Sequence, residues 1–213
     1  MISDRVKGIS PSATLSLNAK VKEMQKAGKD IVLFGAGQPD FSTPENIKKA
    51  ALRAMKENLT GYTAVGGIPE LKKAIKEKFK RDNGLDYGLN EILVSNGGKH
   101  SIYNIFMALL NKGDEVMLPL PYWLSYEEQI KLAGGKPVFV ETDEELKIKS
   151  ELIEEALSEN TKILLLNSPN NPSGKVIEEK ELKERNEKLR RERIEWLKQF
   201  PGLKKEIIES ISN

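Results

Sequence analysis

The chain has 213 residues, 38% of them hydrophobic and 31% charged, a composition typical of a globular protein with one substantial core. Its formal net charge is only +2, which gives no overall case for nucleic-acid binding, and we expect no such partner. The absence of cysteine excludes disulfides, thiolate metal sites and a cysteine nucleophile, and the single histidine, His100, argues against a histidine-based metal site or triad.

No apolar run approaches the roughly 20 residues that a membrane-spanning helix needs. The N-terminus also lacks the apolar h-region of a signal peptide. We therefore expect a cytoplasmic protein with no membrane partner and no metal site.

The first third of the chain predicts helices and one short strand. Apolar Leu17, Val21 and Met24 recur at helical spacing within residues 15–28, and residues 31–34 form an apolar run typical of a strand. A second helix is expected to begin at Thr43-Pro44, with its apolar side chains on one face. A glycine-rich, aromatic-bearing loop over residues 61–67 precedes a basic helix at 69–81.

The middle of the chain alternates strands with helices. Strands are predicted at residues 92–94, 115–118, 137–140 and 162–166, and helices at 101–110, 125–132 and 150–157. Alternation of this kind is typical of a parallel sheet whose faces are covered by helices. The sequence therefore predicts an α/β fold with a mostly parallel sheet and flanking helices.

The sequence after Lys175 has a different composition. Residues 178–198 are largely Glu, Lys and Arg, with oppositely charged pairs at i,i+4, which predicts a charged C-terminal helix. Leu182, Leu189 and Trp196 recur every seven residues along it. Two interpretations stay open: a helix that is simply solvated, or one that uses this narrow apolar stripe to bind itself or a partner.

The loop at residues 167–174 is the most informative segment, because it follows the apolar run of the last predicted strand. Ligands bind beyond the carboxyl ends of strands in open α/β sheets, so this loop is placed to contact one. The amide of Asn171 is suited to donate to a ring oxygen or a carboxylate. Pro, Asn, Ser and Gly are also the ordinary turn residues, so the loop by itself fits a plain turn equally well.

Two other strand ends carry residues suited to a flat, phosphorylated ligand. Gly98 and Lys99 follow the predicted strand 92–94, where glycine amides, a helix N-terminus and a cation favour a phosphate. The glycine spacing fits neither a Walker loop nor a dinucleotide fingerprint. Trp123 follows the next strand and could stack on a ring, although a buried core tryptophan is the commoner role.

Five motifs in the sequence occur together, in order, in one known family. They are Gly37-Gln38-Pro39-Asp40-Phe41, Tyr62 followed by Gly66-Gly67-Ile68-Pro69-Glu70-Leu71, Gly97-Gly98-Lys99, Pro121-Tyr122-Trp123, and Asn167 followed by Asn170-Asn171-Pro172-Ser173-Gly174. The chain resembles class I/II aminotransferases of the aspartate aminotransferase type, the pyridoxal-phosphate enzymes of fold type I. The resemblance covers residues 2–175 and implies an incomplete fold type I large domain.

The resemblance implies pyridoxal phosphate as the cofactor and assigns five residues to it. Gly98 and Lys99 match the positions that bind the phosphate, and Trp123 matches the aromatic residue that stacks on the pyridine ring. Asn171 matches the asparagine that bonds the phenolic oxygen. Tyr62 resembles the tyrosine that reaches the cofactor of a neighbouring subunit, which implies a homodimer.

The substrate implied by the resemblance is an amino acid or a 2-oxo acid. Gly37 resembles the family glycine whose backbone lies against the substrate carboxylate, and Trp123 and Asn171 would also contact the substrate. No catalytic residue can be assigned. The family's pyridinium aspartate, Schiff-base lysine and carboxylate-binding arginine have no recognisable counterparts after Gly174.

We therefore expect an aminotransferase-family chain that retains part of the cofactor site, binds pyridoxal phosphate weakly and without a covalent bond, and is inactive by itself. The expected segments are residues 1–40 from the small domain, 41–175 as the incomplete large domain, and 176–213 as a charged tail outside the family pattern. Two alternatives stay open. One is a non-enzymatic interaction or scaffold protein that uses the C-terminal helix, and the other is one fragment of a split aminotransferase.

Overall fold

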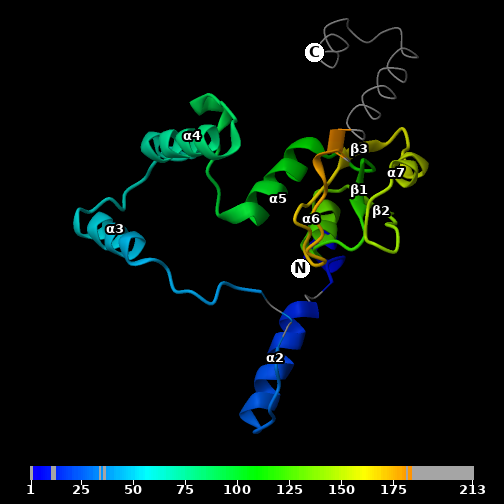
Figure 1. The fold of residues 1–213 in the computed structure, drawn as a ribbon, viewed down its shortest axis with the longest axis horizontal. Helices are drawn as coiled ribbons and strands as arrows, with labels where there is room; N and C mark the ends of the chain where they lie inside the picture. The colour runs from blue at the N-terminus through cyan, green and yellow to red at the C-terminus, as the bar shows by residue number, and fades with distance from the viewer. Residues whose placement is uncertain (1, 11–12, 34, 36, 181, 184–213) are drawn as a thin grey trace, which may run out of the picture. The chain divides into compact units, whose positions relative to one another are not determined.

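The computed structural model describes residues 2–10, 13–33, 35, 37–180 and 182–183. The chain divides into two compact units. Unit 1 contains Met1–Ile9 and Phe106–Asn213, and unit 2 contains Ser10–Ile105. The boundary falls inside helix α5 (Gly97–Leu109; Figure 1).

Unit 1 contains a three-stranded parallel sheet in the order β2-β1-β3. The strands are β1 (Glu115–Pro119), β2 (Lys136–Val140) and β3 (Thr161–Leu164). Helix α6 (Ser125–Leu132) connects β1 to β2, and α7 (Ser150–Ala156) connects β2 to β3 (Figure 1). The predicted α/β fold with a parallel sheet is therefore confirmed. A short helix, α1 (Asp4–Lys7), also belongs to this unit.

The core of unit 1 is built around β1, whose five residues are all buried. Met117 packs with Val140 and Ile153 of α7, while the alternation of side chains along a strand directs its neighbours Val116 and Leu118 to the opposite face. Glycine suits position 135, just before β2. A Cβ there would lie 2.9 Å from Leu110 Cδ1, which would have to shift, and 3.2 Å from the Asp114 carbonyl oxygen, which is a tight contact.

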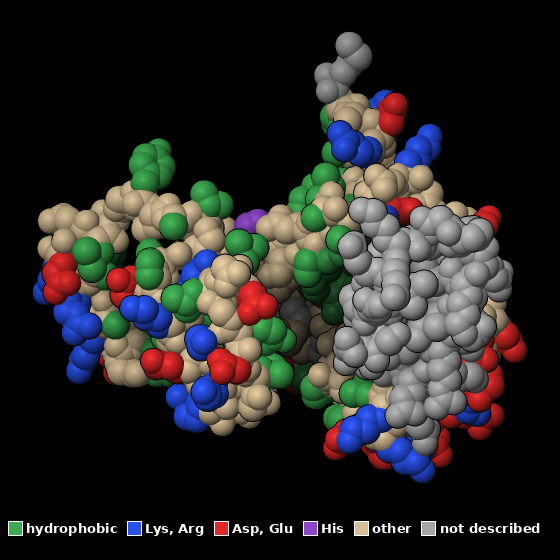
Figure 2. Space-filling view, turned by 90° about the horizontal axis from the view of Figure 1, so that it is seen from above, with side chains coloured by type: hydrophobic (Ala, Val, Ile, Leu, Met, Phe, Trp, Pro, Cys, Tyr) green, Lys and Arg blue, Asp and Glu red, His purple; other side chains and the backbone are tan. Residues whose placement is uncertain are grey.

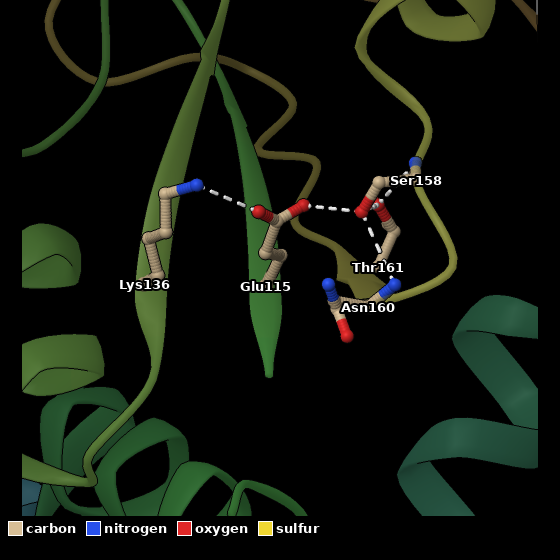
Figure 3. Close-up of polar contacts among 5 residues, drawn as sticks. All are labelled: Glu115, Lys136, Ser158, Asn160 and Thr161. Carbon is tan, nitrogen blue, oxygen red and sulfur yellow. Dashed lines mark hydrogen bonds and ion pairs between the residues drawn. The ribbon is translucent and has the colours of Figure 1, made fainter. Parts of the chain in front are cut away.

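The amino ends of the three strands are joined by a polar network of Glu115, Lys136, Ser158 and Thr161, which we call the Glu115 network (Figure 3). The Glu115 side chain accepts a hydrogen bond from Lys136 Nζ of β2 at 2.8 Å and from Ser158 Oγ at 2.6 Å. The Ser158 amide in turn donates to Thr161 Oγ1 of β3 at 2.9 Å. Glu115 is only 8% exposed, so these partners compensate a carboxylate that has lost most of its water.

Unit 2 consists mainly of helices and loops. Its helices are α2 (Ala13–Lys26), α3 (Glu45–Lys56), α4 (Pro69–Asn83), the 3₁₀ turn η1 (Leu89–Glu91) and the first turns of α5. No residue of α3 or α4 is buried. The best-defined packing joins the start of α4 to the segment before α5. Gly67, at φ +102°, leaves no room for a Cβ against Val94, and Val94 N–H donates to the Gly66 carbonyl oxygen at 3.0 Å.

The structure corrects three sequence predictions of unit 2. Residues 31–33 and 92–94 are not strands, because an apolar run forms a strand only where a second strand pairs with it. The Ile31 carbonyl oxygen accepts a hydrogen bond from the Gln25 side chain instead. Helix α5 also begins at Gly97 rather than at Ser101. Residues 97–100, which were expected to precede the helix, therefore form its first turn.

Only the start of the predicted C-terminal helix lies within the described residues. Residues 179, 180, 182 and 183 are helical, and Lys183 forms an i,i+4 ion pair with Glu179 at 2.6 Å. Leu182 is exposed. Leu189 and Trp196, the other two members of the predicted stripe, lie outside the described residues.

Charged side chains of both signs are interspersed on the face drawn in Figure 2, as the small net charge leads one to expect. Within the part of the chain that the structure describes, no helix combines the length and the apolar character that crossing a membrane requires.

Candidate functional site

The carboxyl end of β1 continues into residues 120–123, which we call the aromatic segment. Leu120 N–H donates to the Val140 carbonyl oxygen at 2.9 Å, and the Leu120 carbonyl oxygen accepts from Thr142 Oγ1 at 2.9 Å. At its other end, the Trp123 carbonyl oxygen accepts from the Tyr126 amide at 2.9 Å, which leads into α6. The aromatic segment is therefore fixed to the end of β2 and to the start of α6.

Tyr122 anchors the middle of the aromatic segment. Its ring stacks on Phe139 of β2, with centroids 5.4 Å apart and planes 9° apart, and its hydroxyl donates to Glu127 Oε2 at 2.5 Å. Burial and the neighbouring Glu127 carboxylate raise the pKa of Tyr122. Lys131, at 2.6 Å from Glu127, lowers the pKa of that carboxyl. The phenol therefore remains a hydrogen-bond donor at neutral pH, and Glu127 remains an acceptor.

Trp123 lies at the end of the aromatic segment, and its side chain is partly exposed. Its indole meets the ring of Tyr126 edge to face, with centroids 5.3 Å apart and planes 85° apart. Tyr126 is buried, and burial raises its pKa. Trp123 thus packs against the buried, neutral ring of Tyr126, and part of its own surface is exposed to solvent.

The carboxyl end of β3 continues into residues 167–174, which we call the amide loop. Two asparagines organise it. Asn167 Oδ1 accepts from the Asn171 amide at 2.8 Å, and Asn170 Oδ1 accepts from the Ser173 amide and hydroxyl at 3.1 and 2.8 Å. These are the side-chain-to-backbone bonds by which asparagine stabilises turns. The loop is therefore both a turn and a candidate site, and the two interpretations are compatible.

One side chain joins the amide loop to the aromatic segment. Asn170 Nδ2 donates to the carbonyl oxygen of Pro121 at 3.1 Å. The two segments also line a shared hollow at the carboxyl end of the sheet, together with Thr142, Lys147 and Lys175. Asn171 itself is exposed, and its side-chain amide makes no hydrogen bond among the described residues. It is therefore available to a ligand at this edge.

The start of α5 offers a different kind of surface, within unit 2. Gly97 has φ +79°, a conformation that favours glycine, and a Cβ at Gly97 or Gly98 would meet no atom within 4 Å. Lys99 and Gly98 are exposed in the first turn. The Asn96 amide donates to His100 Nδ1 at 3.1 Å. A helix N-terminus with open space beside it is suited to an anion such as phosphate.

The predicted site residues are divided between the two units, and none of them lines the hollow described above. Trp123 and Asn171 lie in unit 1 on segments that Asn170 connects. Gly98 and Lys99 lie in unit 2, as do Gly37 and Tyr62, which are exposed residues of loops, with the Tyr62 ring fully exposed. The roles predicted for these residues stay predictions, as do the segment boundaries at 40 and 175.

The sequence profile described as "Aminotransferase class I and II" matches residues 29–194, most of the chain. The chain belongs to this family. The match runs past Lys175 into the charged sequence. The family uses pyridoxal phosphate as its cofactor.

Similar proteins place this aminotransferase chain in the aspartate aminotransferase group. It is 50% identical to the aspartate aminotransferase of Bacillus sp. (strain YM-2) over 186 residues, 86% of this chain and 47% of the relative. It is also 50% identical to a probable aspartate/prephenate aminotransferase of Rickettsia bellii over 90% of this chain and 48% of the relative.

A solved structure, the aspartate aminotransferase from Thermus thermophilus with maleate, matches with a TM-score of 0.84 at 44% identity. That match covers 88% of this chain and 50% of the solved one. The aminotransferase chain thus spans about half the length of the relatives that it matches.

The sequence interpretation named Asn167, Asn170 and Tyr122 only as members of motifs and predicted no role of their own for them. Asn167 and Asn170 fix the amide loop, and Tyr122 fixes the aromatic segment. The signal for the asparagines was available, because Asn followed by Pro, Ser and Gly is typical of turns stabilised by side-chain oxygens. The sequence pattern does not indicate whether Asn170 or Asn171 bonds the aromatic segment.

Proposed function

We propose that this chain carries the cofactor-facing part of an aminotransferase and binds pyridoxal phosphate and an amino acid or 2-oxo acid at the carboxyl end of its sheet. The observation that carries the proposal is the pairing of Trp123 and Asn171. A partly exposed indole and an exposed side-chain amide, which makes no hydrogen bond to the described part of the chain, lie on two hydrogen-bonded segments in a chain of this family. The relatives named for aspartate favour a dicarboxylic substrate.

Residues of the two units, each unit taken by itself, have the chemistry that the cofactor's three binding requirements call for. A phosphate needs backbone amides in open space, which the first turn of α5 supplies at Gly98, with Lys99 adding a positive charge. A pyridine ring needs a flat apolar face, for which Trp123 is suited. The phenolic oxygen needs a donor, and the side-chain amide of Asn171 is one.

When bound, pyridoxal phosphate supplies an electron sink for bonds at the α-carbon of an amino acid. The part of this chain is to bind and orient. Trp123 would fix the plane of the ring and Asn171 would hold an oxygen at its edge, and by the family resemblance the Gly37 backbone would contact a substrate carboxylate. The fully exposed Tyr62 is available to a second subunit, which supports a homodimer.

We further propose that these 213 residues do not transaminate by themselves. The sequence after Gly174 carries no recognisable counterpart of the lysine to which the family attaches its cofactor. Binding is then non-covalent and weak, because stacking, one amide and a phosphate site act without a covalent bond.

The test is a titration of the full chain with pyridoxal phosphate, read by absorbance, followed by dialysis and by treatment with borohydride. We expect saturable binding that dialysis removes, and no borohydride-reducible adduct. A stoichiometric reducible adduct on one lysine would refute the proposed inactivity, and absence of any saturable binding would refute the cofactor site.

A second candidate function, one part of a two-chain aminotransferase, is favoured by the edge of β3. Among the described residues β3 pairs only with β1, so its other edge offers unpaired backbone groups. Leu166, which follows β3, is also exposed. An edge of this kind accepts a parallel strand from a complementary polypeptide.

This candidate is tested by mixing the chain with a polypeptide that contains the C-terminal half of an aspartate aminotransferase. We expect co-elution on a sizing column and a gain of transaminase activity that neither component has. Separate elution with no gain in activity would contradict it. Pyridoxal-phosphate binding by the chain alone does not depend on this outcome.

A further inference from the structure

Asn170 is the only residue of the amide loop whose side chain bonds both segments of the candidate site, as far as the described residues extend. Its Nδ2 donates to the Pro121 carbonyl oxygen at 3.1 Å, and its Oδ1 accepts from Ser173 at 3.1 and 2.8 Å. Its backbone N–H donates to Lys175 and its carbonyl oxygen accepts from Gly174, each at 2.8 Å. Both side-chain polar atoms and both backbone polar groups of Asn170 thus make at least one hydrogen bond.

The bond from Asn170 to Pro121 joins two segments, and the aromatic segment has more other contacts to the sheet than the amide loop has. The aromatic segment is already fixed by Val140, Thr142 and the stacking of Tyr122 on Phe139. The amide loop is closed by bonds to its own residues and to the chain just after it. The bond from Asn170 to Pro121 therefore locates a self-contained loop against a fixed segment, and not the reverse.

We propose that Asn170 is a positioning residue that sets where Asn171 lies relative to Trp123. Because Asn171 directly follows Asn170, any displacement of Asn170 is carried into the backbone of Asn171. Asn171 contributes an exposed amide and Trp123 a partly exposed indole, so their separation decides whether one flat ligand can contact both. The inference rests on the proposed cofactor site, but the contact itself can be tested without any cofactor.

The sharpest variant is Asn170→Asp. It keeps the size and the Oδ1 acceptor for Ser173, and it replaces the donor to Pro121 with an oxygen that repels the carbonyl. Asn46→Asp is the matched control, because it makes the same chemical change at an exposed position of α3 in unit 2. Circular dichroism and the melting temperature verify that each variant is folded.

The first readout needs no ligand. The chain has no native cysteine, so Asn171→Cys provides a unique site for a bimane label, whose emission a nearby tryptophan quenches. All labelled chains carry Trp196→Phe, which leaves Trp123 as the only tryptophan. We expect Trp123→Phe to relieve the quenching. Asn170→Asp should relieve about half of the quenching or more, because it weakens a bond that orders the loop. Asn46→Asp should leave the quenching unchanged.

The second readout is the affinity for pyridoxal phosphate in unlabelled chains. We expect Asn170→Asp to weaken it about tenfold, the scale of one lost hydrogen bond to a neutral group. Quenching that persists in Asn170→Asp would overturn the positioning role, whatever the affinity. Relief of quenching without any pyridoxal-phosphate binding in the parent chain would support the positioning role while refuting the proposed function.

Should Asn170→Asp fail to fold, Ser173→Ala tests the same inference more gently. It removes the hydroxyl bond to Asn170 Oδ1 and the 3.3 Å bond from the Lys175 amide, and it leaves the bond to Pro121. We expect a smaller relief of bimane quenching than from Trp123→Phe. Relief as large as that from Trp123→Phe in a folded Ser173→Ala chain would contradict the proposal, because the bond from Asn170 to Pro121 remains in this variant.

Discussion

The two ends of the sheet in unit 1 differ in how their polar groups are used, although the same three strands supply both. At the amino end, the carboxylate of Glu115 is 8% exposed and is bonded to Lys136 and Ser158 within the chain. At the carboxyl end, the Asn171 amide is exposed and has no side-chain partner among the described residues. The polar side chain at the amino end is satisfied within the chain, whereas the amide at the carboxyl end is exposed.

This difference connects the amino end of the sheet with stability and the carboxyl end with the proposed function. Bonds that satisfy a buried charge contribute to the free energy of unfolding. Exposed aromatic and amide groups contribute little to it, and in open α/β sheets ligands bind at the carboxyl ends of strands. Mutations at the two ends should therefore have separable effects on folding and on cofactor affinity.

Leu118→Ala should give the largest effect, because Leu118 is fully buried in β1, the strand that both ends share. We expect the free energy of unfolding to fall by about 3 kcal/mol, the usual cost of such a cavity, with weakened pyridoxal-phosphate binding as a consequence. Urea unfolding followed by circular dichroism measures it. Leu59→Ala, at a leucine that is 70% exposed, is the control and should change little.

Glu115→Gln changes only the amino end of the sheet. It should lower the free energy of unfolding by about 2 kcal/mol, because Lys136 and Ser158 lose a charged partner. The affinity for pyridoxal phosphate should be unchanged at temperatures where the chain is folded. Glu77→Gln, at an exposed position of α4, is the matched control. A large loss of affinity in folded Glu115→Gln would mean that the two ends are not independent.

Trp123→Ala changes only the carboxyl end of the sheet. The affinity for pyridoxal phosphate should fall about tenfold through the loss of a stacking surface. Trp123→Phe, which keeps an aromatic ring, should retain most of the affinity. Equilibrium dialysis measures both. If the alanine variant binds as tightly as the parent chain, Trp123 is a packing residue against Tyr126 and not a cofactor contact.

The smallest effect expected is a pH dependence. Lys136 and then Ser158 lower the pKa of Glu115 below its ordinary value of 4.5. The folded state therefore binds this proton less readily than the unfolded state, so the stabilisation is complete above about pH 4.5 and is lost as the pH falls through the lower folded-state pKa. Urea midpoints measured down this range should fall less steeply for Glu115→Gln than for the parent chain. Equal slopes would contradict the role assigned to Glu115.

The fold of unit 1 could be predicted well from the sequence. Helix α6 lies at the predicted residues, and β1 and β2 lie within one residue of theirs, because buried strands read as short apolar runs and Gly134-Gly135 marks the intervening stop. Residues 31–34 and 92–94 show the same apolar signal, and those described are not strands. Strand formation depends on a pairing neighbour, which a local pattern does not contain.

The candidate site could be predicted only as a set of motifs. The loop 167–174 and the aromatic residues at 122 and 123 were recognisable by their order and chemistry. The hydrogen bond from Asn170 to Pro121 was not, because it joins residues 49 apart through a turn whose geometry only the backbone reveals. The sequence likewise predicted no role for Glu115, whose two side-chain partners, Lys136 and Ser158, lie on separate segments far from it in the sequence.

The central claim, that the carboxyl end of the sheet binds pyridoxal phosphate against Trp123, is tested most directly by tryptophan emission. In a Trp196→Phe chain, Trp123 is the only emitter of its kind, and pyridoxal phosphate is titrated with N-acetyltryptophanamide as the inner-filter control. We predict saturable quenching that inorganic phosphate reverses by competition. Emission that falls no further than in the control would contradict the account.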